Sequence, residues 1–150
     1  PERFLTEIRR KTFGFIFQQP NLIPGISVLE NVMLPAYPLG VKRTHLRAKA
    51  LNGLSELDLA PKAASKIEWL SGGEAQRVSI VRALINNPSV IIADEPTAHL
   101  DTQLSHRFMG IIEKFKAAGK TIIITSHDPL VYGSIMVDEV VNLRDGKIDG

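Results

Sequence analysis

Residues 70–77 read Leu-Ser-Gly-Gly-Glu-Ala-Gln-Arg and place two adjacent glycines between a serine and a glutamate, directly before an apolar helical pattern. Ser71 and Glu74 have the S-x-x-E spacing of a capping box, which satisfies free N–H groups at the start of a helix. A capping box does not require glycine, and glycine weakens the first turn of a helix. We therefore predict an anion site made by Ser71 and the backbone of Gly72 and Gly73, with a purely structural helix cap as the alternative.

Upstream of this stretch, the sequence predicts one strand and two helices. Residues 13–17 are apolar and rich in phenylalanine, which favours a short buried strand. A short helix is expected over residues 28–34 and a longer one over 44–57, where leucine and alanine recur at helical spacing. Trp69 is interpreted as a packing residue. We expect residues 21–86 to form an inserted helical subdomain that includes the glycine pair.

Downstream of it, strands and helices alternate. A helix follows residue 71 and ends at the Asn-Asn-Pro of residues 86–88, and strands are expected over 89–93 and 121–125. Thr102 is expected to cap the helix between these strands and Gly119 to end it. Residues 137–148 predict a hairpin with its turn at 145–146. This alternation predicts an α/β fold with a mainly parallel sheet, whose core consists of residues 1–20 and 87–150.

Polar residues follow each predicted strand at the edge where open α/β sheets bind ligands. Asp94 and Glu95 end the strand Val-Ile-Ile-Ala, and a carboxylate there suits Mg²⁺ or the activation of a water molecule. An acidic loop that caps the next helix is an equally good interpretation of these two residues alone. Taken singly, His127 and Gln18 are better explained as a structural histidine and a loop residue.

Composition excludes several classes of protein. The 150 residues carry 18 Lys and Arg against 16 Asp and Glu, so the net charge of +2 predicts no nucleic-acid partner. The absence of cysteine excludes disulfides and thiolate chemistry. The longest aliphatic runs are far shorter than the roughly 20 residues of a membrane span, so no direct membrane insertion is expected.

Taken together, the motifs resemble the nucleotide-binding subunit of ATP-binding cassette (ABC) transporters. The resemblance rests on Gln18 after Phe-Ile-Phe, LSGGE at 70–74, ADEP at 93–96, Ala-His-Leu-Asp at 98–101 and Ser-His-Asp at 126–128. Residues 15–35, FIFQQPNLIPGISVLENVMLP, are most similar to the ATPases of lipoprotein-release and macrolide-export systems. The resemblance implies the P-loop NTPase fold of ABC ATPases, with ATP and Mg²⁺ as ligands.

The resemblance also implies a role for each motif. It makes Gln18 the Q-loop glutamine, Glu95 the catalytic glutamate and His127 the switch histidine. It makes residues 70–74, of which Ser71, Gly72, Gly73 and Glu74 would contact ATP, the signature, and it places Asp101 in the D-loop. Mg²⁺ would be held by Asp94 of the Walker B motif and by Gln18. The family's partners are a second cassette, paired head to tail, and a membrane permease, which places such a subunit at the cytoplasmic face of the membrane.

One motif of this family, the P-loop G-x-x-x-x-G-K-[ST], does not occur in the 150 residues. The Gly-Lys-Thr at 119–121 lies between a helix and a strand, the reverse of the required order. We therefore expect an incomplete sheet that lacks the P-loop strand and leaves an edge of strand 121–125 unpaired. These residues alone are expected to bind ATP negligibly, to be inactive, and to aggregate or borrow a strand.

The sequence leaves two hypotheses open. In the first, the chain is most of an ABC ATPase that powers export, and the P-loop lies upstream of Pro1. In the second, it is a catalytically incompetent truncated module that acts only as an interaction partner. The coding sequence directly before Pro1 discriminates between them. The sequence does not identify the transported substrate, because the permease selects it.

Overall fold

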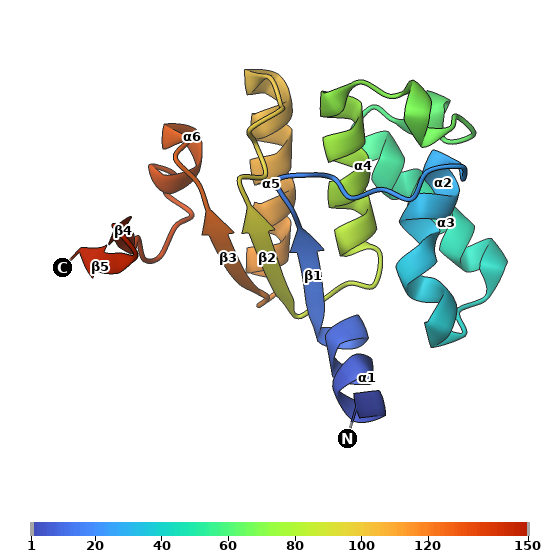
Figure 1. The fold of residues 1–150 in the computed structure, drawn as a ribbon, viewed down its shortest axis with the longest axis horizontal. Coiled ribbons are helices and arrows are strands. Elements are labelled where there is room, and N and C mark those ends of the chain that lie inside the picture. Colours follow the sequence, from blue (N-terminus) through green and yellow to red (C-terminus); the bar gives the residue numbers. More distant parts are fainter. Residues whose placement is uncertain (1, 150) are drawn as a thin grey trace.

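A three-stranded parallel sheet lies at the centre of the computed structural model, which describes residues 2–149 (Figure 1). Its strands are β1 (Phe13–Ile16), β2 (Val90–Asp94) and β3 (Thr121–Thr125), in the order β1-β2-β3. Ile16 pairs with Ala93, and Asp94 pairs with Thr125, so the carboxyl ends of the strands meet at one edge. The predicted α/β fold with a parallel sheet is therefore confirmed.

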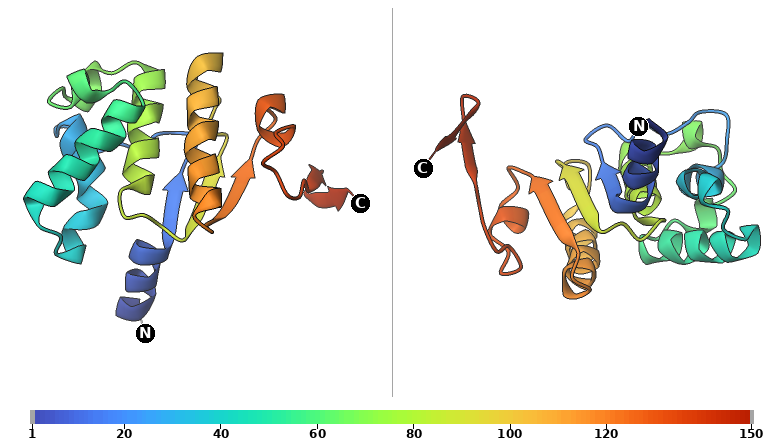
Figure 2. Two further views of the ribbon diagram at one scale, coloured as in Figure 1. Left: turned by 180° about the vertical axis from the view of Figure 1, so that it is seen from behind. Right: turned by 90° about the horizontal axis from the view of Figure 1, so that it is seen from below.

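Helices cover one face of this sheet, and further helices lie beside β1 (Figures 1 and 2). The helices α2 (Val28–Met33), α3 (Arg43–Glu56) and α4 (Gly72–Leu84) pack together, and α4 also contacts β1. Helix α5 (Thr102–Ala117) covers one face of the sheet, and the short α6 (Pro129–Tyr132) follows β3. The remaining helical turns are the 3₁₀ segments Leu34–Leu39, Ala60–Lys62 and Ile67–Trp69. None of the helices among residues 2–149 is long and apolar enough to cross a membrane.

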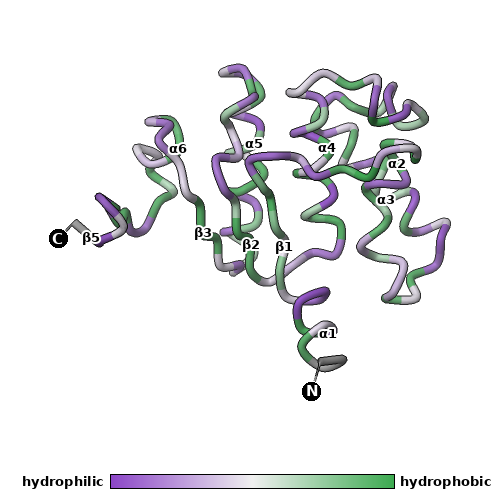
Figure 3. The backbone as a smooth tube through the Cα atoms, in the orientation of Figure 1, coloured by the Kyte–Doolittle hydropathy of each residue, from purple (hydrophilic) through white to green (hydrophobic). Residues whose placement is uncertain are grey.

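Strand β1 is covered on one face only, which corrects the prediction of a buried strand. Gly14 and Ile16 are buried, and Gly14 lies so close to α4 that a Cβ there would be 2.6 Å from the carbonyl oxygen of Ala83. Phe15 points to the opposite face and is 41% exposed, and Ile123 is in register with it on β3 and is 53% exposed. The tube in Figure 3 shows that the sheet strands are mainly hydrophobic, and the exposure of Phe15 and Ile123 leaves the apolar face on their side uncovered.

Two local predictions are wrong. Trp69 is 72% exposed and is not a packing residue. The cap of α5 is Asp101, whose carboxylate accepts from Leu104 N at 2.8 Å, because Thr102 is already the first helical residue. No element is predicted before residue 13, and the structure adds α1 (Glu2–Thr12), which runs directly into β1, with Leu5 and Ile8 spaced as on one helical face.

The chain ends in a small hairpin beside the main sheet. Its strands are β4 (Asn142–Arg144) and β5 (Lys147–Asp149), so the first strand starts later than predicted. Asp145 and Gly146 both have positive φ angles, of 50° and 75°, as a two-residue turn of this kind requires. Within residues 2–149 the outer edge of β3 is unpaired, as expected, because the hairpin forms a separate sheet.

Candidate functional site

The residue after β2 adopts a strained backbone conformation. Glu95 has a φ of 44°, a region that residues other than glycine rarely occupy. Its amide donates to the carbonyl oxygen of Thr125 at 2.9 Å, which continues the pairing of β2 with β3 past the end of β2. Strain of this kind costs about 1–3 kcal/mol and collects at functional sites. The conformation turns the Glu95 side chain toward the residues that follow β3.

The carboxylate of Glu95 binds His127. Oε1 lies 2.9 Å from Nδ1 of His127, and Oε2 is buried without a hydrogen-bond partner among the described residues. The hydrogen bond to Glu95, its negative charge and the weaker charge effect of Asp128 raise the pKa of His127 above the ordinary 6.5. The imidazole itself is 84% exposed, whereas Glu95 is 21% exposed. One oxygen of Glu95 therefore orients the histidine, and the other is buried with its hydrogen-bonding capacity unused.

Asp94 is exposed beside this pair. Its Oδ1 accepts from the Thr125 hydroxyl at 2.5 Å, which fixes the carboxylate at the carboxyl edge of the sheet. No group of three or more His, Asp or Glu side chains among residues 2–149 forms a metal cluster. Mg²⁺ is compatible with this arrangement, since it is commonly held by one or two carboxylates together with water and phosphate oxygens. The exposed carboxylate of Asp94 supplies an oxygen ligand of the kind that such a site needs.

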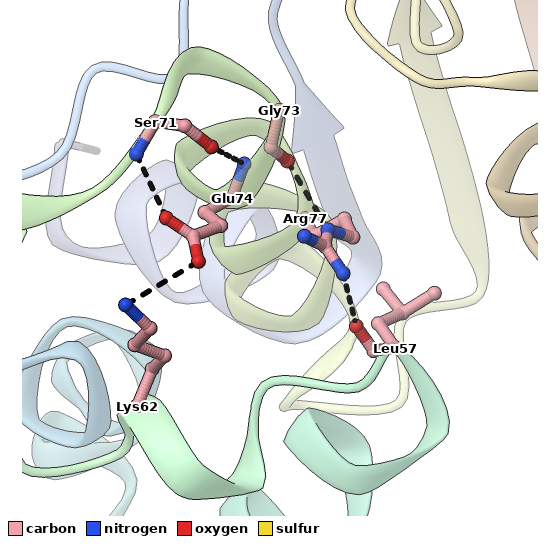
Figure 4. Close-up of polar contacts among 6 residues, drawn as sticks. All are labelled: Leu57, Lys62, Ser71, Gly73, Glu74 and Arg77. Atoms are coloured by element: carbon pink, nitrogen blue, oxygen red, sulfur yellow. Dashed lines mark hydrogen bonds and ion pairs between the residues drawn. The ribbon is translucent and has the colours of Figure 1, made fainter.

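Helix α4 begins at the predicted capping box (Figure 4). Ser71 N donates to Glu74 Oε2 at 2.8 Å, and Glu74 N donates to Ser71 Oγ at 3.2 Å. The hydrogen bond from the Ser71 amide, together with the charge of Lys62, whose Nζ lies 3.6 Å from Glu74 Oε1, lowers the pKa of Glu74. Arg77 ties this helix start to α3 because it donates to both Gly73 O and Leu57 O. The start of α4 is thus held in place by hydrogen bonds within its first turn and to the end of α3.

The two glycines of this turn have different surroundings. A Cβ on Gly73 would lie 2.8 Å from the carbonyl oxygen of His99, so this glycine is required by the chain's own loop after β2. A Cβ on Gly72 would meet nothing within 4 Å. At residue 73, the group that approaches the glycine closely belongs to this chain. At residue 72 the backbone is open to an external ligand.

The predicted site residues fall into two groups. The first lies at the sheet edge and contains Asp94, Glu95 and His127, with Gln18 exposed in the loop after β1. The second contains Ser71, Gly72, Gly73 and Glu74. Among the described residues, no hydrogen bond or ion pair joins one group to the other. Asp101 caps α5.

Sequence reasoning missed Gln76, which is completely buried in α4. Its Nε2 donates to the carbonyl oxygens of Phe17, at 3.3 Å, and Pro96, at 3.5 Å. The signal was present in the sequence, because Gln76 lies four residues before the buried Ile80 and so on the core-facing side of the helix.

Comparison with known proteins identifies the class that this fold and edge define. The family model described as ABC transporter matches residues 4–98, and the chain belongs to that family. A second model, described as AAA domain, putative AbiEii toxin, Type IV TA system, matches residues 67–132. The chain is an ABC transporter ATP-binding module with the corresponding part of the P-loop NTPase fold.

Among relatives, the chain is similar to the macrolide export ATP-binding/permease protein MacB. It is 43% identical to MacB of Hyphomonas neptunium and 44% identical to that of Neisseria meningitidis serogroup A, in each case over 96% of this chain and 22% of the relative. The chain thus spans about a fifth of the length of these curated relatives. A solved structure of the ATP-binding cassette MJ0796, a dimer bound to ADP and Pi, superimposes with a TM-score of 0.90 at 37% identity, covering 100% of this chain and 66% of that one.

Proposed function

We propose that this chain forms most of the ATP-hydrolysing cassette of an export system, with residues 21–86 as a helical subdomain and 1–20 and 87–150 as the core. Glu95 is the proposed catalytic base. The observation that carries this proposal is the state of its carboxylate: Oε1 is held by His127 at 2.9 Å, and Oε2 is buried with no donor among the described residues. A carboxylate that is held through one oxygen and has its second oxygen unpaired can orient and deprotonate a water molecule that reaches it.

Asp94 and Gln18 are the proposed Mg²⁺ ligands, and the ion, when bound, neutralises charge on the phosphates. His127 lies at the same edge, and Glu95 favours its protonated form by raising its pKa. The protonated ring donates from Nδ1 to Glu95 and carries a second N–H on Nε2, which can donate to the γ-phosphate. Gln18 and Asp94 follow neighbouring parallel strands, which supports a shared role at this edge.

Ser71, Gly72, Gly73 and Glu74 are proposed to contact ATP held by a second cassette, in a head-to-tail pair. Their separation from Glu95 and His127 within one chain supports this division, because each group would serve a different nucleotide. Asp101, at the start of α5, is proposed to lie where the two cassettes meet. A helix N-terminus contributes roughly 0.3–2 kcal/mol to anion binding, whereas micromolar affinity needs about 8 kcal/mol. The phosphates must therefore be gripped mainly by a P-loop, which residues 1–150 do not contain.

The proposed partner besides the second cassette is a membrane permease, through which the chain would act at the inner face of the membrane. The printed name of the MacB relatives joins an ATP-binding part to a permease and so supports this partner. Macrolide export is the property named for those relatives. The substrate transported with this chain would be selected by its permease.

The test is the variant Glu95→Gln in the protein as its gene encodes it. ATP turnover should fall by about 10²–10⁴-fold, because the amide cannot accept a proton from water. ATP affinity, measured by calorimetry, should remain within about threefold of the wild type, since Glu95 acts in the transition state. Turnover at the wild-type rate would remove Glu95 from this role. Absence of both ATP binding and turnover in the wild-type protein would instead support the non-enzymatic module.

A further inference from the structure

Gln76 occupies an unusual position between the two groups of site residues. Its carboxamide nitrogen contacts Phe17 O and Pro96 O, which belong to the residues directly before Gln18 and directly after Glu95. Three segments that are distant in the sequence therefore meet at a single side chain. Because both contacts are with carbonyl oxygens, the nitrogen must face them, and this settles the orientation of the amide.

The environment of Gln76 shows that the side chain is not placed there for stability alone. The residue is 0% exposed, and its Oε1 is buried without a hydrogen-bond donor among the described residues. A buried polar atom without a partner is costly, and an apolar side chain of similar size would avoid that cost. An apolar side chain could not make the two hydrogen bonds to carbonyl oxygens, and these bonds explain glutamine at this position.

A second side chain of the same helix holds the other end of the loop that contains Gln18. The guanidinium of Arg82 donates to Pro20 O and Asn21 O, both at 2.7 Å. Gln18 and Gln19 therefore lie between two attachments to α4, one at Phe17 and one at Pro20. Ser71 caps helix α4, so the loop is fixed to the same element that carries the proposed contact with the partner's ATP.

From this geometry we propose that Gln76 is a positioning residue, which fixes Gln18 and Glu95 relative to each other and to the start of α4. This inference rests on the proposed function, because Gln18 and Glu95 have their roles from it. The carboxamide does not touch the reacting atoms. Its effect on turnover comes from the two backbone carbonyls that it holds.

The experiment compares Gln76→Met with Ser79→Ala in the protein as its gene encodes it. Ser79 is a matched control because it is buried on the same helix, and its hydroxyl donates only to the carbonyl oxygen of Gln76 within α4, at 2.8 Å. Gln76→Met should lower kcat by between about tenfold and a hundredfold, since small misplacements of catalytic groups have effects of this size. KM for ATP should change by less than about threefold, and Ser79→Ala should change neither constant.

Hydrogen exchange provides a readout that does not depend on catalysis. In Gln76→Met, amide exchange should become faster in both segments 17–19 and 96–99, and it should remain unchanged in Ser79→Ala. Unchanged exchange in either segment overturns the inference, whatever happens to turnover, and so does an equal loss of kcat in the control. If the wild-type protein does not hydrolyse ATP, the proposed function fails, and exchange alone then decides the role of Gln76. Should Gln76→Met fail to fold, Gln76→Leu, which also lacks the donor, replaces it.

Discussion

Helices α2 and α4 begin with the same capping box and differ in the residues of their first turns. Ser27 N and Ser71 N each donate at 2.8 Å to the carboxylate three residues later, Glu30 or Glu74, and each serine hydroxyl accepts at 3.2 Å from that residue's amide. The two backbone hydrogen bonds of each capping box are equal in length, and in α2 the Ser27 hydroxyl also donates to Glu30 Oε2 at 2.7 Å. The molecule therefore contains an internal control for the interpretation of residues 70–77 as a helix cap.

The first turns of the two helices have different surroundings. After Ser27 come Val28 and Leu29, which are 0% and 7% exposed and pack into the core. After Ser71 come Gly72 and Gly73, of which the first is open to solvent and the second lies against the loop after β2. A capping box is thus compatible with bulky residues in the first turn. The cap does not explain the glycines of α4: Gly73 is required by the loop after β2, and contact of Gly72 with an external ligand is the proposal.

The largest changes in stability and ATP turnover are expected when either glycine of the α4 first turn is replaced by alanine. Gly73→Ala should lower the free energy of unfolding by about 1–3 kcal/mol, because the new Cβ meets a backbone carbonyl that cannot easily move. Gly72→Ala should raise it by up to about 1 kcal/mol through better helix propensity, yet lower ATP turnover by about tenfold or more. Urea unfolding and ATPase assays measure the two effects. Wild-type turnover in Gly72→Ala would show that the start of α4 serves only as a helix cap.

A smaller effect is expected from removal of either capping hydroxyl. Ser27→Ala and Ser71→Ala should each lower the free energy of unfolding by about 0.5–2 kcal/mol, since each leaves a helix N–H without its partner. Only Ser71→Ala should also raise KM for ATP. Equal kinetic constants in the two variants would show that the cap of α4 has no function beyond that of α2.

The smallest effect is a shared dependence of stability on pH. Hydrogen bonds from Ser27 lower the pKa of Glu30, and the backbone hydrogen bond from Ser71 lowers that of Glu74, both from the ordinary 4.5. A lowered pKa in the folded state means that each carboxylate stabilises the protein above the unfolded-state pKa and loses this contribution as pH falls through the folded-state value. Carboxyl NMR titrations of the wild type should show both values below 4.5. A pKa of Glu74 at or above its ordinary value would mean that the two boxes are not equivalent.

Much of the fold was readable from the sequence because its signals are local. Apolar runs predicted the strands at 89–93 and 121–125, and the spacing of Ser71 and Glu74 predicted the capping box. The residues after the strands could be placed at one edge, since parallel strands have their carboxyl ends on the same side. The pairing of His127 with Glu95 then required only that their strands be neighbours, which the β2–β3 register provides.

The missed features depend on contacts between distant segments. Nothing local in Gly-Gly indicates that Gly73 lies against His99, and nothing in Phe-Gly-Phe indicates that only one face of β1 is covered. The role of Gln76 required knowledge of where Phe17 and Pro96 lie. Asp101 and Thr102 are both good caps, and only the structure shows which of them precedes the first helical residue.

The exposure of Trp69 has a practical consequence. It is the only tryptophan in the chain, it is 72% exposed, and it lies two residues before Ser71. Indole fluorescence is sensitive to the polarity around the ring, so the emission of this protein on excitation near the red edge of absorption reports on one spot beside the start of α4. The binding of another molecule beside Trp69 can therefore be followed in real time by the wavelength and the quenching of the tryptophan emission, without any attached dye.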